Sequence, residues 1–314
     1  MSLVADADTR TAVNVALRGH KRQLGGMLFR FGLLATLLLA LAILLVLIVT
    51  TLVDAWPVLT TRGWDFVKSD TSSLAERAGV WQGLVGSLIL TGFVATVALP
   101  IGIAAAIYLQ EYTRDTRTSR ILIANIRNLA GVPSVVYGIL GLVVFVQALR
   151  AITGPESNGR SYMSGGLTLA VLVMPIVILI TMEALRAVPS NIREGAYGVG
   201  ATRWEVVRSH VLPYAAPGIF TGAILALARA FGETAALLLV GAVTGYLSTP
   251  SNQTPIHVLQ GLYTALPTQI FAWAKLPAAD WQSNTAAAII VLLVAILLVN
   301  FLAILLRNRY ERTW

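Results

Sequence analysis

Long apolar runs separated by short polar segments dominate the pattern of this 314-residue chain. Six runs are long enough to cross a bilayer, since about 20 apolar residues at 1.5 Å per residue span a hydrocarbon core of roughly 30 Å. They cover residues 31–53, 80–109, 121–149, 166–185, 216–243 and 286–306. The pattern predicts an all-α, polytopic protein with six transmembrane helices, in which residues 31–314 form one membrane domain.

Composition supports a membrane location. Hydrophobic residues make up 56% of the chain and charged residues 12%, about half the charged share of a soluble domain. The first run is longer than the apolar region of a signal peptide, which is about 7–15 residues, so we expect an uncleaved first helix. It follows a basic extension, residues 1–30.

The basic residues predict an orientation. Both termini, the 110–120 loop and the 186–214 loop together carry 15 Lys and Arg, whereas the alternate loops carry 6. Cytoplasmic loops are enriched in Lys and Arg, so we expect the termini and the 186–214 loop to be cytoplasmic. The net charge of +8 is spread over short loops, which fits this role better than binding of nucleic acid.

Several kinds of chemistry are excluded or lack a signal. The chain has no Cys, so it has neither disulfides nor thiolate metal sites. The three His residues lack ligand spacing, and we expect no metal and no cofactor. No phosphate-binding loop of the Gly-x-x-x-x-Gly-Lys-Ser/Thr type occurs, so we do not expect this chain to hydrolyse ATP, and we assign no catalytic residue.

Two charges stand inside the fifth apolar run, Arg229 and Glu233. Charges at bilayer depth cost a few kcal/mol or more, so they mark a functional site by default. Residues four apart share one helix face, and a guanidinium fork suits a tetrahedral oxyanion. Glu233 could hold Arg229, or accept a hydrogen bond from a protonated phosphate oxygen. An interhelical salt bridge and a self-satisfied ion pair are the alternatives.

Two further positions are candidates for the same route. Pro133 must kink or break the third run, because it lacks an N–H and clashes one turn back. The break could line a pore or serve only packing. Glu183, near the end of the fourth run, is a weaker candidate for the route, and the alternative is a surface carboxylate close to Arg186.

Gly198 and Gly200 divide the 186–214 loop into two short predicted helices, a knob that could dock into another protein. A solvated loop is the alternative. The spacing resembles the cytoplasmic coupling motif of ABC-importer permeases, although Gly195 and His210 depart from it. The residues that the resemblance assigns to coupling are Arg193, Glu194, Ala196, Gly200, Thr202, Leu212 and Pro213.

Residues 228–235, Ala-Arg-Ala-Phe-Gly-Glu-Thr-Ala, look like the Arg-x-x-Gly-Glu-Thr signature of phosphate-specific ABC transporter permeases. Residues 131–138 look like the third-span motif of the same family, and the tail from 286 resembles its A-type subunit. The resemblance covers about residues 80–312. It implies the type I importer architecture in a bacterial inner or plasma membrane.

The resemblance also implies partners: a C-type permease subunit, a homodimeric ATPase and a phosphate-binding protein, with inorganic phosphate as substrate. Two alternatives remain at this point. One is a permease for another oxyanion, such as sulfate or molybdate. The other is a self-contained anion channel or secondary transporter.

Overall fold

The computed structural model describes residues 24–243 and 255–310, and the chain divides into two compact units, 1–53 and 54–314. In the first unit the described residues belong to α2, a helix that runs from Leu24 to Thr61. All of its side chains from 26 to 50 are exposed. A helix that is apolar all round suits lipid. Most of the basic extension, residues 1–23, lies outside the described residues.

The second unit is helical throughout its described residues. Its short helices are α3 (Gly63–Lys68), α5 (Arg117–Ala130), α6 (Ser134–Gly141), α7 (Arg150–Thr153), α9 (Ser190–Gly198), α10 (Arg203–Val206), α12 (Ala235–Val240), α13 (Pro255–Gln260) and α14 (Leu266–Trp273). The long helices are α4 (Trp81–Ile107), α8 (Tyr162–Arg186), α11 (Leu212–Phe231) and α15 (Ala279–Tyr310). Three π-helical turns, η1 (Tyr108–Tyr112), η2 (Leu142–Ala148) and η3 (Val207–Val211), extend or join them.

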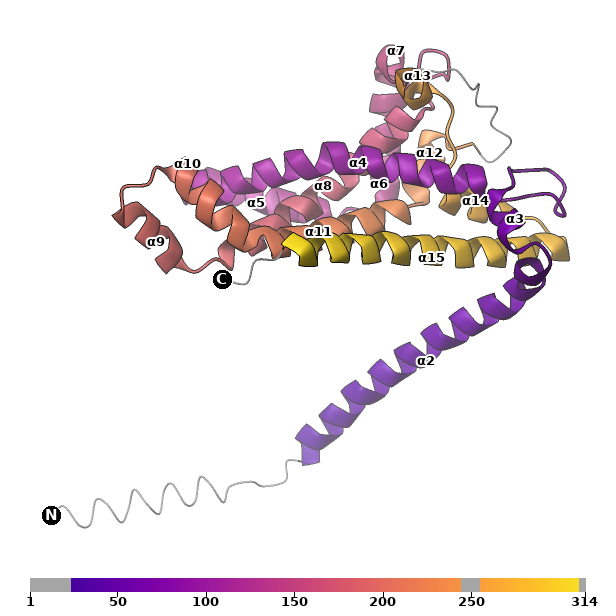
Figure 1. Cartoon of the computed structure of the whole chain (residues 1–314), viewed down its shortest axis with the longest axis horizontal. Coiled ribbons are helices and arrows are strands. Elements are labelled where there is room, and N and C mark those ends of the chain that lie inside the picture. Colours follow the sequence, from indigo (N-terminus) through magenta and orange to yellow (C-terminus); the bar gives the residue numbers. More distant parts are fainter. Residues whose placement is uncertain (1–23, 244–254, 311–314) are drawn as a thin grey trace. The chain divides into compact units, whose positions relative to one another are not determined.

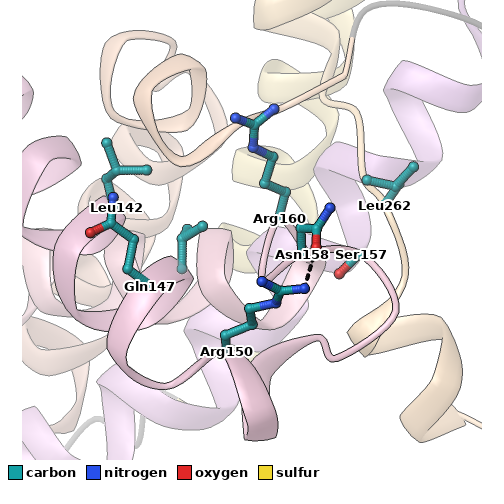
Figure 2. A pocket seen from close by; sticks show the side chains of 8 residues that line it. Leu142, Gln147, Arg150, Ser157, Asn158, Arg160 and Leu262 are labelled. Atoms are coloured by element: carbon teal, nitrogen blue, oxygen red, sulfur yellow. Dashed lines mark hydrogen bonds between the residues drawn. The ribbon is translucent and has the colours of Figure 1, made fainter.

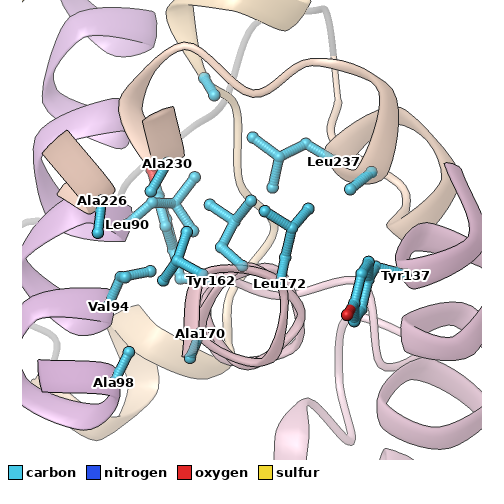
Figure 3. Packing of buried hydrophobic residues seen from close by; sticks show 14 of the residues in the cluster. Leu90, Val94, Ala98, Tyr137, Tyr162, Ala170, Leu172, Ala226, Ala230 and Leu237 are labelled. Carbon is cyan, nitrogen blue, oxygen red and sulfur yellow. The ribbon is translucent and has the colours of Figure 1, made fainter. Parts of the chain in front are cut away.

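Helix α8 lies at the centre of the second unit, with α4 and α11 against it (Figure 1). Glycines allow the close approach: a Cβ on Gly102 of α4 would meet Val177 of α8 at 2.8 Å, and one on Gly222 of α11 would meet Ile180 at 2.3 Å. The main apolar cluster fills the space between these helices, with Leu90, Leu172 and Ala226 from three of them (Figure 3). Close packing of small residues is the usual way in which membrane helices associate.

The third predicted span, 121–149, is broken at Pro133, as the missing N–H of this residue predicts. Helices α5 and α6 with η2 meet at a break of 131–133 and differ in direction by 98°. Neither piece, at 14 and 15 residues, is long enough to cross a bilayer alone by rise per residue. The break at Pro133 follows from its missing N–H: its ψ of 141° is extended, and α6 begins directly after it.

The fifth predicted span, 216–243, also ends early. Helix α11 stops at Phe231, and the short α12 follows at Ala235. The described residues therefore contain five helices long and apolar enough to cross a membrane, or six if the bent α5–α6 pair counts as one span. This agrees with a polytopic all-α membrane protein.

The segment that follows α12 is more structured than the predicted loop of 244–285. Residues 244–254 lie outside the described residues, but α13, α14 and the start of α15 occupy the rest. Trp273, the last residue of α14, is buried in this segment. It is only 4% exposed and lies against Phe66 and Trp281, with ring centroids 6.4 and 5.3 Å away.

Candidate functional site: a charged helix break and a braced loop segment

The break between α11 and α12 holds both charges of the fifth apolar run. Arg229 is in the last turn of α11, whereas Glu233 follows the end of that helix and precedes α12. The expectation that both share one continuous helix face is therefore wrong. Helix α11 ends at this point, with Gly232 as its C-cap residue.

Glu233 is used by the backbone. Its Oε1 accepts hydrogen bonds from the amides of Ala235 and Ala236, at 3.1 and 3.4 Å. These are amides that the first turn of α12 cannot satisfy itself. A negative charge is also favourable at the positive end of a helix dipole. The carboxylate thus stabilises the start of α12 and is held half-buried in a fixed position.

Arg229 is exposed on the chain and forms neither a hydrogen bond nor an ion pair with any described residue. Its position in the last turn of α11 suits the helix dipole, but this leaves the guanidinium donors free. The alternative of a self-satisfied ion pair with Glu233 does not hold within the described chain. A partner outside the chain, a watery route or a second subunit must receive these donors.

The second break lies close to the first. The hydroxyl of Tyr137, in α6, donates to the carbonyl of Leu129 in α5 at 2.9 Å and so ties the two halves together across Pro133. The positive charge of Arg229 is near enough to act on this hydroxyl. The pieces beyond the two breaks also pack together, since a Cβ on Gly138 of α6 would lie 2.9 Å from Ala236 Cα in α12.

Glu183 does not join this group. Its Oε1 pairs with Arg186 Nη1 at 3.3 Å on the surface at the end of α8. Gly218 of α11 faces Ala184 and Gly222 faces Ile180, so Glu183 lies about ten residues, or roughly 15 Å, from the level of Arg229 along these antiparallel helices. This geometry favours the surface carboxylate that was the alternative for Glu183.

The 186–214 segment begins with a brace centred on Arg193. Its Nη2 donates to Glu111 Oε1 and to the carbonyl of Leu185, both at 2.8 Å, and its Nη1 donates to the carbonyl of Val188 at 2.8 Å. The pair with Glu111 is partly buried, with side chains 21% and 8% exposed. Arg193 thus ties α9 to the ends of α4 and α8 and does not present its charge to a partner.

Helix α9 has one buried and one open side. Ala196 is 6% exposed and packs with the apolar cluster below α9, whereas Glu194 and Tyr197 are exposed. The chain then turns at Gly200, whose φ of +87° favours glycine. Val199, directly before the turn, and Trp204, beyond it, are 87% and 56% exposed. The open side of this segment is a candidate contact surface for another protein.

The second short helix is not separate, which corrects the expectation of two divided pieces. Arg203 to Phe231 runs on through α10, η3 and α11, with Leu212 and Pro213 inside it and not at a helix boundary. Thr202 caps its start: the Thr202 hydroxyl accepts from the Glu205 amide, and the Glu205 carboxylate accepts from Thr202. These hydrogen bonds hold the pKa of Glu205 below its usual value.

Sequence reasoning missed Glu111 as the partner of Arg193. The available signal was a lone carboxylate at the end of the second apolar run, directly before three arginines. Within the described residues no group of three His, Asp or Glu side chains could hold a metal. His210 and His257 are described, whereas His20 lies outside the described residues.

Comparison with known proteins places these features in context. The family described as "Binding-protein-dependent transport system inner membrane component" matches residues 98–313. The probable ABC transporter permease protein YqgH of Bacillus subtilis is 36% identical over 58% of this chain and 57% of its own length. The phosphate transport system permease protein PstC of Mesorhizobium japonicum is 32% identical, over 66% and 68%. PstA 1 of Mycobacterium tuberculosis is 31% identical, over 80% and 78%.

Solved structures agree on the fold. A bacterial ABC transporter involved in the import of the acidic polysaccharide alginate has a chain that superposes with a TM-score of 0.63. The match covers 93% of this chain and 100% of that one, at 16% sequence identity. At this identity the similarity concerns the helical architecture alone.

Proposed function

Because this chain belongs to the family of binding-protein-dependent transport system inner membrane components, we propose that it is a permease subunit of an ATP-driven importer of inorganic phosphate. Relatives named as phosphate transport system permeases support phosphate as the substrate. The observation that carries the proposal is Arg229, a guanidinium at a helix break inside an apolar run, with no hydrogen-bond or ion-pair partner among the described residues.

The chemistry of the break supports an oxyanion. The Arg229 fork can donate two parallel hydrogen bonds to a tetrahedral anion. Glu233 is fixed by two backbone amides through Oε1, and no described residue donates to its Oε2. That oxygen can accept from a protonated phosphate oxygen, which sulfate lacks at neutral pH. Arg229 would therefore attract the anion, and Glu233 would favour an anion that carries a proton.

The cytoplasmic segment supplies the coupling in this proposal. An ATPase on a separate, homodimeric subunit would contact the open side of α9 and α10, where Glu194, Tyr197 and Trp204 are exposed. The brace at Arg193 would carry its motion to α4 and α8. Residues 203–231 form one continuous helix, so the same segment would be linked directly to Arg229.

The remaining parts of the assembly are proposed with it. A C-type permease subunit would complete the path, and a phosphate-binding protein would deliver the anion from the opposite side. This chain would be the A-type subunit, as its tail suggests; relatives of both types are similar to it. Both termini and the 186–214 segment would be cytoplasmic, as the distribution of Lys and Arg predicts.

Reconstitution tests the proposal. The full complex is reconstituted in liposomes, with the binding protein on one side of the membrane and ATP on the side of the ATPase. Labelled phosphate is expected to accumulate on the side of the ATPase. Removal of ATP or of the ATPase should stop uptake, and excess sulfate should not compete. Phosphate flux through the purified chain alone, without ATP, would contradict an ATP-driven importer and indicate a channel. Equal competition by sulfate would replace phosphate by a broader oxyanion substrate.

A further inference from the structure

A second cationic site lies at the other end of α8 from the braced segment. A pocket of about 520 Å³ is lined by side chains of η2, α7 and the loop that leads into α8. Figure 2 shows Gln147, Arg150, Asn158 and Arg160 around this hollow. No carboxylate stands among the described residues that line it. The pocket therefore presents two guanidinium groups and two amides, which are hydrogen-bond donors suited to an anion.

Neither arginine is neutralised within the described chain. Arg150 donates to the amide oxygen of Asn158, a neutral partner. Arg160 forms no ion pair with a described residue. Its side chain lies against Gly241, where an added Cβ would be only 2.7 Å from Arg160 Cδ. Gly241 ends α12 with a φ of +98°, so its missing side chain makes room for Arg160 beside that helix end.

The wall of the pocket is rigid. Ser157 donates to the carbonyl of Gln260 at 2.7 Å, and Ser164 donates to the carbonyl of Gly159 at 2.6 Å. Asn158 has a φ of +54°, an unusual value for a residue with a side chain and the single such case among the described residues. Backbone strain held in place by surrounding contacts is a frequent property of binding sites. The loop thus fixes Asn158 and, through it, Arg150.

The pocket is also close to the charged helix break. Arg160 lies at the C-terminal end of α12, and Glu233 lies at its N-terminal end. Six residues of helix separate the two ends, a distance of about 9 Å. An anion that leaves this pocket therefore has one short helix to pass before it reaches the level of Glu233 and Arg229.

From this geometry we infer that the Arg150–Arg160 pocket binds a tetrahedral oxyanion and receives inorganic phosphate before it reaches Arg229. The inference rests on the proposed function and adds a second station to it. The side chains that line the pocket offer no carboxylate as acceptor for the phosphate proton, only the amide oxygens and the hydroxyl of Ser157, so the pocket binds sulfate and phosphate about equally. Selection for phosphate then belongs to Glu233 alone. The open pocket and its exposed arginines make this binding weak and sensitive to salt.

The test uses the assembled permease and ATPase without the binding protein, in phosphatidylcholine nanodiscs. All variants carry Arg229→Gln, which removes phosphate binding at Arg229. The measured binding then reports on the pocket alone, and it does not depend on whether the proposed path through Arg229 is correct. Equilibrium dialysis with labelled inorganic phosphate is expected to show binding that sulfate displaces. Arg150→Gln with Arg160→Gln should weaken it at least tenfold, since each charge-assisted contact contributes 1.5–3 kcal/mol and 1.4 kcal/mol is tenfold.

The control removes two positive charges elsewhere on the same predicted side, with Arg77→Gln and Lys275→Gln, both exposed and outside the pocket. It should change the affinity by less than about twofold. Equal weakening of phosphate binding in both double variants would indicate only a general attraction of anions and would contradict a specific site. Unchanged phosphate binding in the pocket variant would also contradict it. A third variant, Arg150→Lys with Arg160→Lys, keeps the charge and should recover part of the affinity.

A lipid headgroup carries the same phosphate chemistry, and the last arm separates the two sources. Addition of phosphatidylglycerol to the nanodiscs should leave phosphate binding unchanged if the pocket serves the free anion. If phosphatidylglycerol abolishes binding and is retained by the parent but not by the pocket variant, the occupant is a lipid and the inference is wrong.

Discussion

Arg193 and Arg229 differ in the contacts that each makes within the chain. Arg193 donates to Glu111 and to the last carbonyls of α8, and it is mostly buried. Arg229 is exposed and has no partner among the described residues. A guanidinium with most of its donors engaged within the chain stabilises structure, whereas a guanidinium with free donors in an apolar run is available to a ligand. Arg193 is therefore part of a rigid structural connection, whereas Arg229 can bind the transported anion.

The largest expected effect is at Arg229. Arg229→Gln should lower ATP-driven phosphate uptake by about 10- to 100-fold, because one charge-assisted fork is worth roughly 1.5–3 kcal/mol. The complex should assemble and melt as before, since no hydrogen bond or ion pair with a described residue is lost. Uptake into liposomes is the measurement, with Arg120→Gln, an exposed arginine paired with Asp115, as the matched control. Uptake within twofold of wild type would remove Arg229 from the path.

The next effect concerns the Arg193 brace. Arg193→Met leaves the Glu111 carboxylate unpaired at 8% exposure, which should cost roughly 2–4 kcal/mol of stability, since a buried charge without its partner is strongly destabilising. Thermal unfolding of the complex measures it. Glu111→Met with Arg193→Met should cost less than the sum of the single changes.

The neighbour Glu194→Gln is the control for this comparison. Glu194 is exposed and has no described contact, so the substitution should leave the Tm unchanged. An equal loss of stability at both positions would show that the brace is not the reason.

A smaller effect is expected where the two broken helices meet. Gly138→Ala places a Cβ 2.8 Å from Leu239 Cδ1 and 2.9 Å from Ala236 Cα, and such overpacking typically costs about 1–3 kcal/mol. Gly92→Ala is the control, because a Cβ there meets nothing within 4 Å and alanine is the better helix former. A loss of Tm in Gly138→Ala but not in Gly92→Ala supports the contact; the reverse order contradicts it.

The smallest effect is at the start of α10. The hydrogen bonds from Thr202 lower the pKa of Glu205, so their stabilisation is present above the usual pKa of roughly 4.3 and is lost as the pH falls through the lowered value. The Tm difference between wild type and Glu205→Gln should therefore be larger near pH 7 than at about pH 3.5. A difference independent of pH would mean that the ionised carboxylate does not contribute.

The sequence predicted the spans from apolar length and the fold class from composition, because lipid requires long helices whose backbone groups are satisfied internally. It predicted the break at Pro133 but not its 98° angle, which depends on how α6 packs on α12 and α8. It missed the end of α11, because Gly232 alone does not decide whether a helix continues. The alanines and leucines of 235–240 continue the apolar pattern without interruption.

The candidate site shows the same limit. Residue types and spacing indicated Arg229, Glu233 and Arg193, but the partner of each side chain depends on tertiary contacts. Glu111 is 82 residues from Arg193 along the chain, and no local pattern connects them. The amides that hold Glu233 became available only because the helix is broken there.

Cysteine accessibility tests the central claim most directly, since the chain contains no native Cys. Arg229→Cys in the assembled, membrane-embedded importer should react with a charged, membrane-impermeant thiol reagent. Leu297→Cys, an exposed position on the apolar α15, should react only with an apolar reagent. If Arg229→Cys behaves like Leu297→Cys, the guanidinium faces lipid or a dry contact and the anion path does not pass it.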